Sequence, residues 1–386
     1  MMAERMRNIN EYYFSNKLKE IEALNNQGFK VINLGIGSPD MAPDHEVINA
    51  LNSSAVNPKN HSYQNYRGIF ELRQSIADWL MKTYAISTNP NENILPLLGS
   101  KEGIMHISMT YLNPGDEVLI PNPGYPAYAT AAKLAGANVK YYNLTENNNW
   151  DFQINEIEGL ICSNTKIIWL NFPNMPTGYK GNWETIHQIV KLTNERKILL
   201  CNDNPYSLIL NEEPKSILSL TSNWEYLLEL NSLSKSHNMA GWRLGMLISN
   251  KKRIDEIIKF KSNMDSGMLL PIQHAAITAL SLDGIWFHKL NNTYKLRKTL
   301  ALELLNLLNC KINHQQVGMF VWAKIPDNQI DAYGFSDEIL LNTQIFITPG
   351  AIFGSNGNRY VRVSLCNDEK TFKNAINRIK RWKKSA

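Results

Sequence analysis

The chain has 386 residues, of which 44% are hydrophobic and 19% charged, so it can bury one large core and that of a smaller companion domain. Its 40 basic and 35 acidic residues give a formal net charge of +5, and one short basic run, RIKRWKK, gives little support for nucleic-acid binding. No signal-like apolar start and no uncharged apolar stretch of 18 residues occurs, so we expect a soluble protein without membrane spans.

The metal-binding residue types are scattered. The four cysteines are widely spaced: Cys162, Cys201, Cys310 and Cys366. They form no CxxC pair, so the sequence predicts neither a zinc site nor a disulfide framework, and a reducing cytoplasm fits best. His45, His61 and His106 show neither paired spacing nor an acidic cluster of the usual kind, so we expect no metal.

Two amphipathic helices are predicted in the first third of the chain, over GIFELRQSIADWLMKTY from Gly68 and GSKEGIMHISMTYL from Gly99. Short β-rich runs follow, starting at Asp116, Asn138, Thr165, Lys197, Tyr226 and Arg243. Helix candidates at 125–134 and 183–193 lie between them. This alternation predicts an α/β domain with a mostly parallel sheet. Polar residues crowd the C-terminal ends of the runs, where such sheets place their ligands.

Beyond about Pro271 the pattern becomes helical, with a long candidate at 291–309, and an α+β segment with the strand-like runs GMFVWAKI and RYVRVSL follows. The sequence then predicts a C-terminal helix that begins after an N-cap at Asp368. Its apolar face is Phe372, Ile376, Ile379 and Trp382.

Three stretches carry candidate chemistry. In NSLSKSHNMAGWRLG, Lys235 could supply a reactive amine, with nearby hydroxyls and Arg243 as phosphate ligands, although alone it also fits a surface lysine. In CNDNPYS, Asp203 could pair with a heterocycle nitrogen or merely begin a turn. In NFPNMPTG, Met175 precedes a Pro-Thr-Gly turn and is either an ordinary flanking residue or a change inside an active site.

In this order, the motifs resemble the class I/II aminotransferases, which are fold-type I pyridoxal-phosphate enzymes. The similar stretches are NLGIGSPD, HSYQNYRG, GSKEG, PNPGYPAY, NFPNMPTG, DNPY, SLSK, GWRLG and RYVRVSL. They span most of the chain, and the residues within these motifs are most similar to those of the branch with aspartate, aromatic and LL-diaminopimelate aminotransferases. The resemblance implies a large PLP-binding domain at 48–285 and a smaller α+β domain formed by 1–47 with 286–386.

The resemblance also implies a role for individual residues. Lys235 matches the lysine that forms a Schiff base with pyridoxal 5'-phosphate and then moves a proton as acid and base. Asp203 matches the partner of the pyridine nitrogen, Tyr206 the phenol at the cofactor O3′, and Tyr125 the ring stacked on the cofactor.

Further positions match phosphate ligands, namely Ser100, Lys101, Ser232, Ser234 and Arg243, with backbone amides at a helix N-terminus. Tyr63 matches a tyrosine that reaches the phosphate of a neighbouring subunit, so the resemblance implies a homodimer with shared active sites.

Arg362 matches the arginine that binds the substrate α-carboxylate, and Gly37 a backbone position beside it. Met175 departs from the pattern. The family's Asn-Pro-Thr-Gly motif has an amide donor to O3′ there, and a methionine has none. Asn174 should point to the opposite face of an extended strand, so it is a poor substitute unless the strand bulges or a water intervenes.

We therefore expect an aminotransferase that exchanges an amino group between an amino acid and a 2-oxo acid, with glutamate and 2-oxoglutarate as one pair. The alternatives are a fold-type I lyase that catalyses β-elimination and a non-catalytic PLP-binding protein. The substrate stays open. Aromatic rings at Tyr12 and Tyr13 would favour aromatic amino acids, a cation such as Lys101 would favour dicarboxylates, and Asp265 or Ser266 could also face the substrate.

Overall fold

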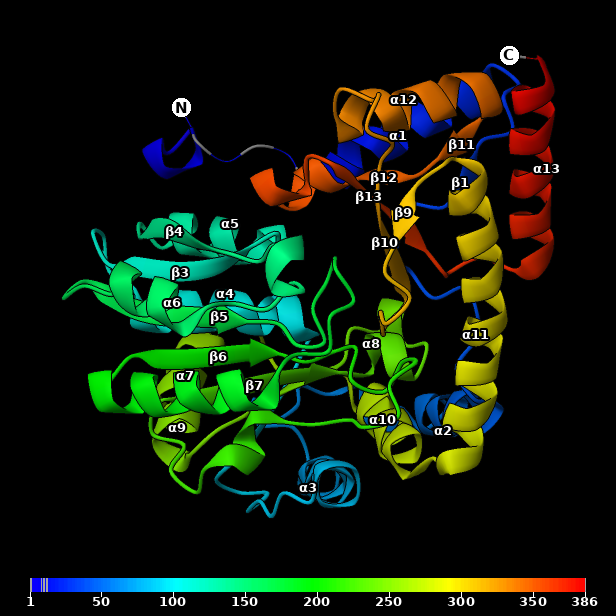
Figure 1. Cartoon of the computed structure of the whole chain (residues 1–386). Helices are drawn as coiled ribbons and strands as arrows, with labels where there is room; N and C mark the ends of the chain where they lie inside the picture. Colours follow the sequence, from blue (N-terminus) through cyan, green and yellow to red (C-terminus); the bar gives the residue numbers. More distant parts are fainter. Residues whose placement is uncertain (1, 8, 10, 12, 386) are drawn as a thin grey trace.

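The computed structural model describes residues 2–7, 9, 11 and 13–385. Its largest sheet has seven strands, and Figure 1 shows how the other elements lie around it. The strand order is β2-β8-β7-β6-β5-β3-β4. The strands are β2 (Ile94–Leu97), β3 (Glu117–Asn122), β4 (Asn138–Asn143), β5 (Thr165–Leu170), β6 (Leu199–Asp203), β7 (Leu227–Ser232) and β8 (Gly245–Ile248). Strands β4, β3, β5, β6 and β7 are parallel, and β8 runs antiparallel to both β7 and β2. The predicted α/β class with a mostly parallel sheet is confirmed.

Helices cover both faces of this sheet. On one face, α4 (Ser100–Tyr111), α5 (Pro126–Leu134) and α9 (Lys251–Lys261) share an apolar cluster with Ile167 and Trp169 of β5. Ile168 and Leu170, the alternate residues of β5, join the larger cluster on the other face. This face carries α6 (Ile154–Leu160) and α7 (Trp183–Arg196). Burial on both faces explains why the strands read as continuous apolar runs.

Strand β2 was not predicted. It contains Pro96, and a proline within a short apolar run argues against a central strand. The structure places β2 at the edge of the sheet, bonded only to β8 among the described strands, and an edge strand tolerates a proline.

Two smaller sheets lie beside the large one (Figure 1). One has the order β12-β13-β10-β9, and the other pairs β1 with β11 in parallel. The strands are β1 (Ile32–Asn33), β9 (Lys311–Ile312), β10 (Phe320–Lys324), β11 (Ile345–Phe346), β12 (Thr348–Pro349) and β13 (Tyr360–Ser364). Residues near both ends of the chain therefore meet in one substructure. The domain division at 48–285 stays a prediction.

The remaining helices pack around the large sheet and the two smaller sheets. They are α1 (Tyr13–Asn26), α2 (His45–Ala55), α3 (Phe70–Tyr84), α8 (Leu233–Ser236), α10 (Leu270–Ser281), α11 (Gly284–Leu307), α12 (Ala332–Thr343) and α13 (Glu369–Ser385). Short 3-10 turns are Glu4–Met6, Pro58–His61, Glu146–Asn148, Ile217–Leu220, Ala240–Trp242, Gly350–Phe353 and Ser355–Gly357. The long helix α11 packs on α13 along one side of the molecule (Figure 1).

The predicted terminal helix is confirmed as α13. Phe372, Ile376 and Ile379 are buried, and the Asp368 carboxylate accepts a hydrogen bond from the Thr371 N–H at 2.7 Å. This bond satisfies an N–H group of the first turn that has no partner within the helix.

Two expected absences can be compared with the structure. Among the described residues, no helix combines the length and apolarity needed to cross a bilayer. All four cysteines are free thiols, with Cys162 exposed and the other three buried.

Candidate active site

A cavity of about 560 Å³ lies where the parallel strands β5, β6 and β7 end. It is lined by every predicted site residue except Tyr63: Gly37, Ser100, Lys101, Tyr125, Asp203, Tyr206, Ser232, Ser234, Lys235, Arg243 and Arg362. The carboxyl edge of an open parallel sheet is the expected place for a ligand, because the loops that leave the strands converge there. Residues from the N-terminal loop and from β10 and β13 close the other side.

Lys235 lies in α8, just beyond the end of β7. Its ammonium donates a hydrogen bond to the Gly37 backbone oxygen at 2.5 Å. Burial lowers the pKa of Lys235, because the cavity solvates the charged form poorly. A lysine in this setting yields a neutral amine more readily than an exposed lysine does.

Asp203 is the last residue of β6 and is 5% exposed. The Tyr128 hydroxyl donates to Oδ2 at 3.1 Å, while Oδ1 has no hydrogen-bond partner among the described residues. Burial raises the pKa of the Asp203 carboxyl to about 7, and the bond from Tyr128 opposes this rise. A carboxylate with one unsatisfied buried oxygen fits a cationic N–H group from a bound molecule.

Sequence reasoning missed Tyr128, which lies in the first turn of α5 and stacks on Trp169 with ring centroids 4.8 Å apart. It also missed Asn171, whose amide donates to the Asp203 backbone oxygen at 2.6 Å. Both residues stand inside motifs that the sequence analysis singled out, PNPGYPAY and NFPNMPTG. Their roles as supports depend on contacts between strands.

A polar cradle forms where α4 begins. Ser232 Oγ donates to Ser234 Oγ at 2.8 Å, and Arg243 Nη1 donates to the Ala240 backbone oxygen at 2.8 Å. Gly99, the residue before α4, has a φ of 90° that favours glycine, and a Cβ atom there would also lie 2.2 Å from Arg243 Nη2 and push this guanidinium aside. Hydroxyls, an arginine and a helix N-terminus together suit an anion such as a phosphate.

Arg362 projects from β13 and is 4% exposed. Nη2 donates to the Gly35 backbone oxygen at 2.8 Å, and Nη1 donates to the Met175 sulfur at 3.1 Å. The guanidinium lies 3.9 Å from the centroid of the Phe320 ring. A Cβ at Gly37 would lie 2.3 Å from the same ring, so Phe320 fits tightly between the N-terminal loop and the arginine.

The NFPNMPTG stretch forms a closed turn. The Asn174 side-chain oxygen accepts from the Thr177 hydroxyl at 2.8 Å and from the Thr177 N–H at 3.3 Å. Met175 lines the cavity and Asn174 does not. Both residues lie in the turn that follows β5, so the alternation expected along an extended strand does not apply to them. The Asn174 amide is therefore turned into the loop.

Two further tyrosines line the cavity and are partly buried. Tyr125 is the cap of α5 and meets Tyr128 edge to face, with ring centroids 5.7 Å apart. Tyr206 meets Phe320 edge to face at 5.8 Å, and burial raises the pKa of its phenol, which is therefore protonated at neutral pH.

Several candidates lie away from the cavity. Tyr63 is 90% exposed on the surface. Tyr12 lies outside the described residues, and Tyr13 packs against Phe14 and Tyr333 rather than lining the cavity. Ser266 is exposed, and Asp265 pairs with the Lys261 ammonium at 2.5 Å. The residues of α1 that do line the cavity are Phe14, Ser15 and Leu18.

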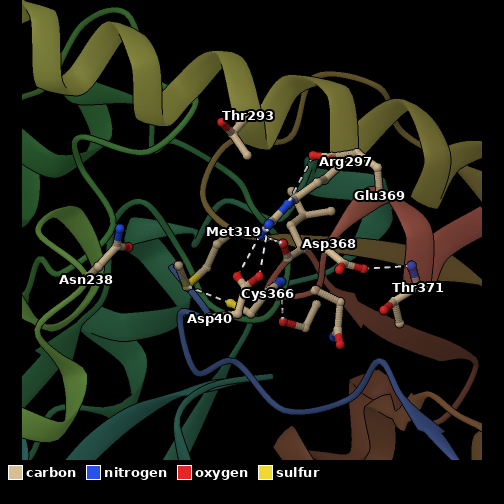
Figure 2. Close-up of polar contacts among 12 residues, drawn as sticks. Asp40, Asn238, Thr293, Arg297, Met319, Cys366, Asp368, Glu369 and Thr371 are labelled. Atoms are coloured by element: carbon tan, nitrogen blue, oxygen red, sulfur yellow. Dashed lines mark hydrogen bonds and ion pairs between the residues drawn. The ribbon is translucent and has the colours of Figure 1, made fainter. Parts of the chain in front are cut away.

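The N-terminal loop is tied to helix α11 by a partly buried ion pair, shown in Figure 2. Arg297 of α11 donates to both carboxylate oxygens of Asp40, at 2.6 and 2.9 Å, and to the Leu365 backbone oxygen at 3.1 Å. Cys366 lies beside this pair, with its sulfur 3.8 Å from that of Met319. The loop that carries Gly35 and Gly37 is thus fixed at its far end.

The expectation that His106 has no acidic neighbours was wrong. Glu102, His106 and Asp265 offer ligand atoms that all lie within 4.8 Å of one another. Glu102 precedes His106 by one helical turn, a spacing visible in the sequence, whereas Asp265 comes from a distant loop. Because Lys261 already pairs with Asp265, a metal ion would have to displace an ammonium.

The chain is similar to known proteins over nearly its whole length. The family model Aminotransferase class I and II matches residues 30–379. The LL-diaminopimelate aminotransferase of Dehalococcoides mccartyi is 34% identical with 100% of both chains covered, and that of Natranaerobius thermophilus is 36% identical with 98% of each covered.

Solved structures agree in fold. The apo structure of BacF from Bacillus subtilis has a TM-score of 0.93 at 30% identity and covers 99% of this chain and 98% of its own. Thermus thermophilus aspartate aminotransferase has a TM-score of 0.92 at 22% identity, with 99% of each chain covered, a likeness in fold alone.

Proposed function

The chain belongs to the class I and II aminotransferases, PLP-dependent enzymes that move an amino group between an amino acid and a 2-oxo acid, and we propose that the cavity at Lys235 is its active site. The observation that carries this proposal is the convergence of Lys235, Asp203 and Arg362 on one cavity. It brings together a buried amine, a carboxylate with an unsatisfied oxygen and a buried guanidinium.

The residues of the cavity fit the cofactor. The unpartnered Oδ1 of Asp203 suits the protonated ring nitrogen, and the cradle of Ser100, Ser232, Ser234 and Arg243 suits the phosphate. Tyr125 would stack on the ring and Tyr206 would donate to O3′. When bound, PLP supplies an electron sink for charge that develops at the substrate α-carbon.

We assign the proton transfer to Lys235. The Nζ atom is buried, and burial lowers the pKa of the ammonium. The Gly37 carbonyl, which belongs to the N-terminal loop, orients Nζ through a hydrogen bond. A neutral amine can accept the proton that leaves the substrate α-carbon. The ammonium so formed can then donate a proton to the second atom that takes part in the amino-group transfer. Arg362 would hold the α-carboxylate through its planar fork and so present that carbon to Nζ.

For substrates, we propose glutamate and 2-oxoglutarate as one pair and an amino acid with a second anionic group as the other. LL-diaminopimelate is the first candidate, because several relatives at 34–36% identity carry that name. Lys101 supports this choice, since it lines the cavity and offers a cation for a second carboxylate.

We also propose a homodimer in which Tyr63 completes the phosphate site of the neighbouring subunit. Its support within this chain is the 90% exposure of a large aromatic side chain that lies outside its own cavity. A tyrosine so exposed is more usual at a protein contact than on a free surface.

The test is a panel of amino donors incubated with 2-oxoglutarate, with glutamate as the measured product. Lys235→Ala should abolish glutamate formation with every donor. Lys298→Ala is the matched control, because Lys298 also donates to a backbone carbonyl, that of Gln316, but lies outside the cavity. Equal turnover in the Lys235→Ala variant and the wild type would end the assignment.

A further inference from the structure

The residue that departs from the family motif touches the arginine that we assign to the substrate carboxylate. Met175 Sδ lies 3.1 Å from Arg362 Nη1, within the cavity wall. We propose that Met175 is a positioning residue, whose sulfur accepts this hydrogen bond and orients the guanidinium before a substrate binds. The proposal rests on the proposed function, in which Arg362 holds the α-carboxylate.

Met175 has a fixed backbone. Its N–H donates to the Asn171 side-chain oxygen at 2.9 Å, and the turn that follows is closed by a bond from the Gly178 N–H to the Asn174 backbone oxygen at 2.8 Å. The Met175 side chain is 5% exposed. A flexible thioether on so constrained a backbone can hold one position.

Arg362 is held by two acceptors and by aromatic rings, of which Phe320 lies nearest and Phe353 lies 4.7 Å from the guanidinium. The Gly35 carbonyl binds Nη2, the Met175 sulfur binds Nη1, and the Phe320 ring lies against the guanidinium plane at 3.9 Å. Two acceptors on the two terminal nitrogens fix the rotation of the fork, and the ring supports its plane. A fork that is already oriented loses less conformational freedom when it binds a carboxylate.

Sulfur suits this role because it is neutral. A carboxylate at position 175 would pair with Arg362 and compete with the substrate, whereas a thioether is a weak acceptor that leaves the positive charge uncancelled. The Gly35 carbonyl is likewise neutral. The arginine can therefore be oriented by the protein and still attract an anion.

The experiment measures dissociation constants for two unreactive probes, succinate and 3-phenylpropionate, on the cofactor-loaded enzyme by calorimetry. The probes share only the carboxylate and its short alkyl chain, so an effect on Arg362 should appear in both. Met175→Leu keeps the volume and removes the acceptor, and Met175→Gln restores an acceptor at similar length. Met246→Leu, a buried methionine outside the cavity, is the control.

We expect Met175→Leu to bind both probes about fivefold more weakly, the effect of one hydrogen bond of about 1 kcal/mol. Met175→Gln should lie within about twofold of the wild type, and Met246→Leu should be unchanged. Met175→Ile has the same expected result as Met175→Leu, so the test does not depend on the folding of one variant. A change in packing alone would not be reversed by Gln.

Unchanged binding in the Leu and Ile variants overturns the proposal, and so does weakening with only one probe. Arg362→Lys separates this outcome from a failure of the proposed function. If Arg362→Lys binds both probes as tightly as the wild type, the assignment of Arg362 to the carboxylate is wrong, whatever Met175 does.

Discussion

Arg297 and Asp40, which are 257 positions apart in the sequence, form a two-bond ion pair, from Nη1 to Oδ1 at 2.6 Å and from Nη2 to Oδ2 at 2.9 Å. The Arg297 side chain is 4% exposed and that of Asp40 is 32% exposed. Asp40 lies in the same loop between β1 and α2 as Gly35 and Gly37, whose carbonyls accept from Arg362 and Lys235. The pair therefore supports both groups that we assign to the reaction.

Asp40→Asn should weaken this support. We expect it to destabilise the fold by about 2 kcal/mol, because a buried guanidinium loses the carboxylate bonded to both terminal nitrogens and keeps only Glu369, 3.5 Å from Nε, as a charged partner. It should raise KM for both substrates more than it lowers kcat, since the loop positions Arg362. Thermal unfolding and steady-state kinetics measure the two effects. Glu303→Gln is the control, because it removes an exposed ion pair with Lys380 from the same helix. Equal effects of the two variants would contradict the supporting role.

Met175→Asn should lower the pH at which the absorbance of the bound cofactor changes. An asparagine amide would donate to the ionised O3′ and weaken its attraction for the neighbouring proton, whereas Met175 cannot donate. The expected shift is about one pH unit, the equivalent of about one hydrogen bond. A spectrophotometric pH titration of both loaded proteins measures it. The idea fails if the variant titrates at the same or a higher pH.

Asp203 should make the stability of the protein freed of cofactor depend on pH. Burial raises the pKa of its carboxyl from the ordinary 3.8 to about 7, so the folded state binds a proton that the unfolded state has lost, and stability falls as the pH rises from about 4 to about 7. Asp203→Asn should remove this loss, and at pH 8 it should unfold on the order of a few degrees higher than the wild type. Melting curves of both proteins from pH 5 to pH 8 measure this difference. A lower melting temperature of the variant at pH 8 would contradict the prediction.

Tyr63 should act in the neighbouring subunit. We expect Tyr63→Phe to weaken PLP binding by about tenfold through the loss of a charge-assisted hydrogen bond. Mixing it with Lys235→Ala under conditions of subunit exchange should restore activity. One site of the mixed dimer would then have both Lys235 and a partner tyrosine. No gain on mixing, with subunit exchange verified by mass, would place the action of Tyr63 within its own chain.

Lys101→Met should separate substrate classes. If the Lys101 ammonium binds a second carboxylate, kcat/KM for glutamate should fall by at least about tenfold, while that for a donor with an uncharged side chain should change by less than about threefold. The comparison between donors is the measurement. An equal loss for both would instead indicate a role of Lys101 at the cofactor.

The sequence predicted the sheet and most of the cavity because those features are local. A parallel strand buried on both faces carries its own apolar run, and Asp203 and Ser232 are the last residues of such runs. Strand β2 escaped prediction because Pro96 interrupts its pattern, and only its pairing with β8 places it at an edge.

The contacts between distant residues could not be predicted. No spacing in the sequence links Arg297 to Asp40 or Asp265 to His106, because each pair comes from separate elements that packing brings together. The sequence did not predict the partner of the Met175 sulfur either, because Met175 and Arg362 also come from separate segments. The expected alternation of faces assumed an extended strand, whereas Met175 lies in the turn after β5, and only the fold places Arg362 beside it.

Phe320, which fits tightly between Gly37 and Arg362, belongs to a later part of the chain than the residues that we assign to the cofactor. The residues proposed to hold the cofactor within one subunit lie between positions 100 and 243, whereas Phe320 and Arg362 follow more than 70 residues later. During synthesis from the N-terminus, the residues that we assign to PLP within this chain are therefore made before Phe320 and Arg362. A chain that stops before β13 would keep every residue assigned to its own cofactor and lack the arginine that selects amino acids.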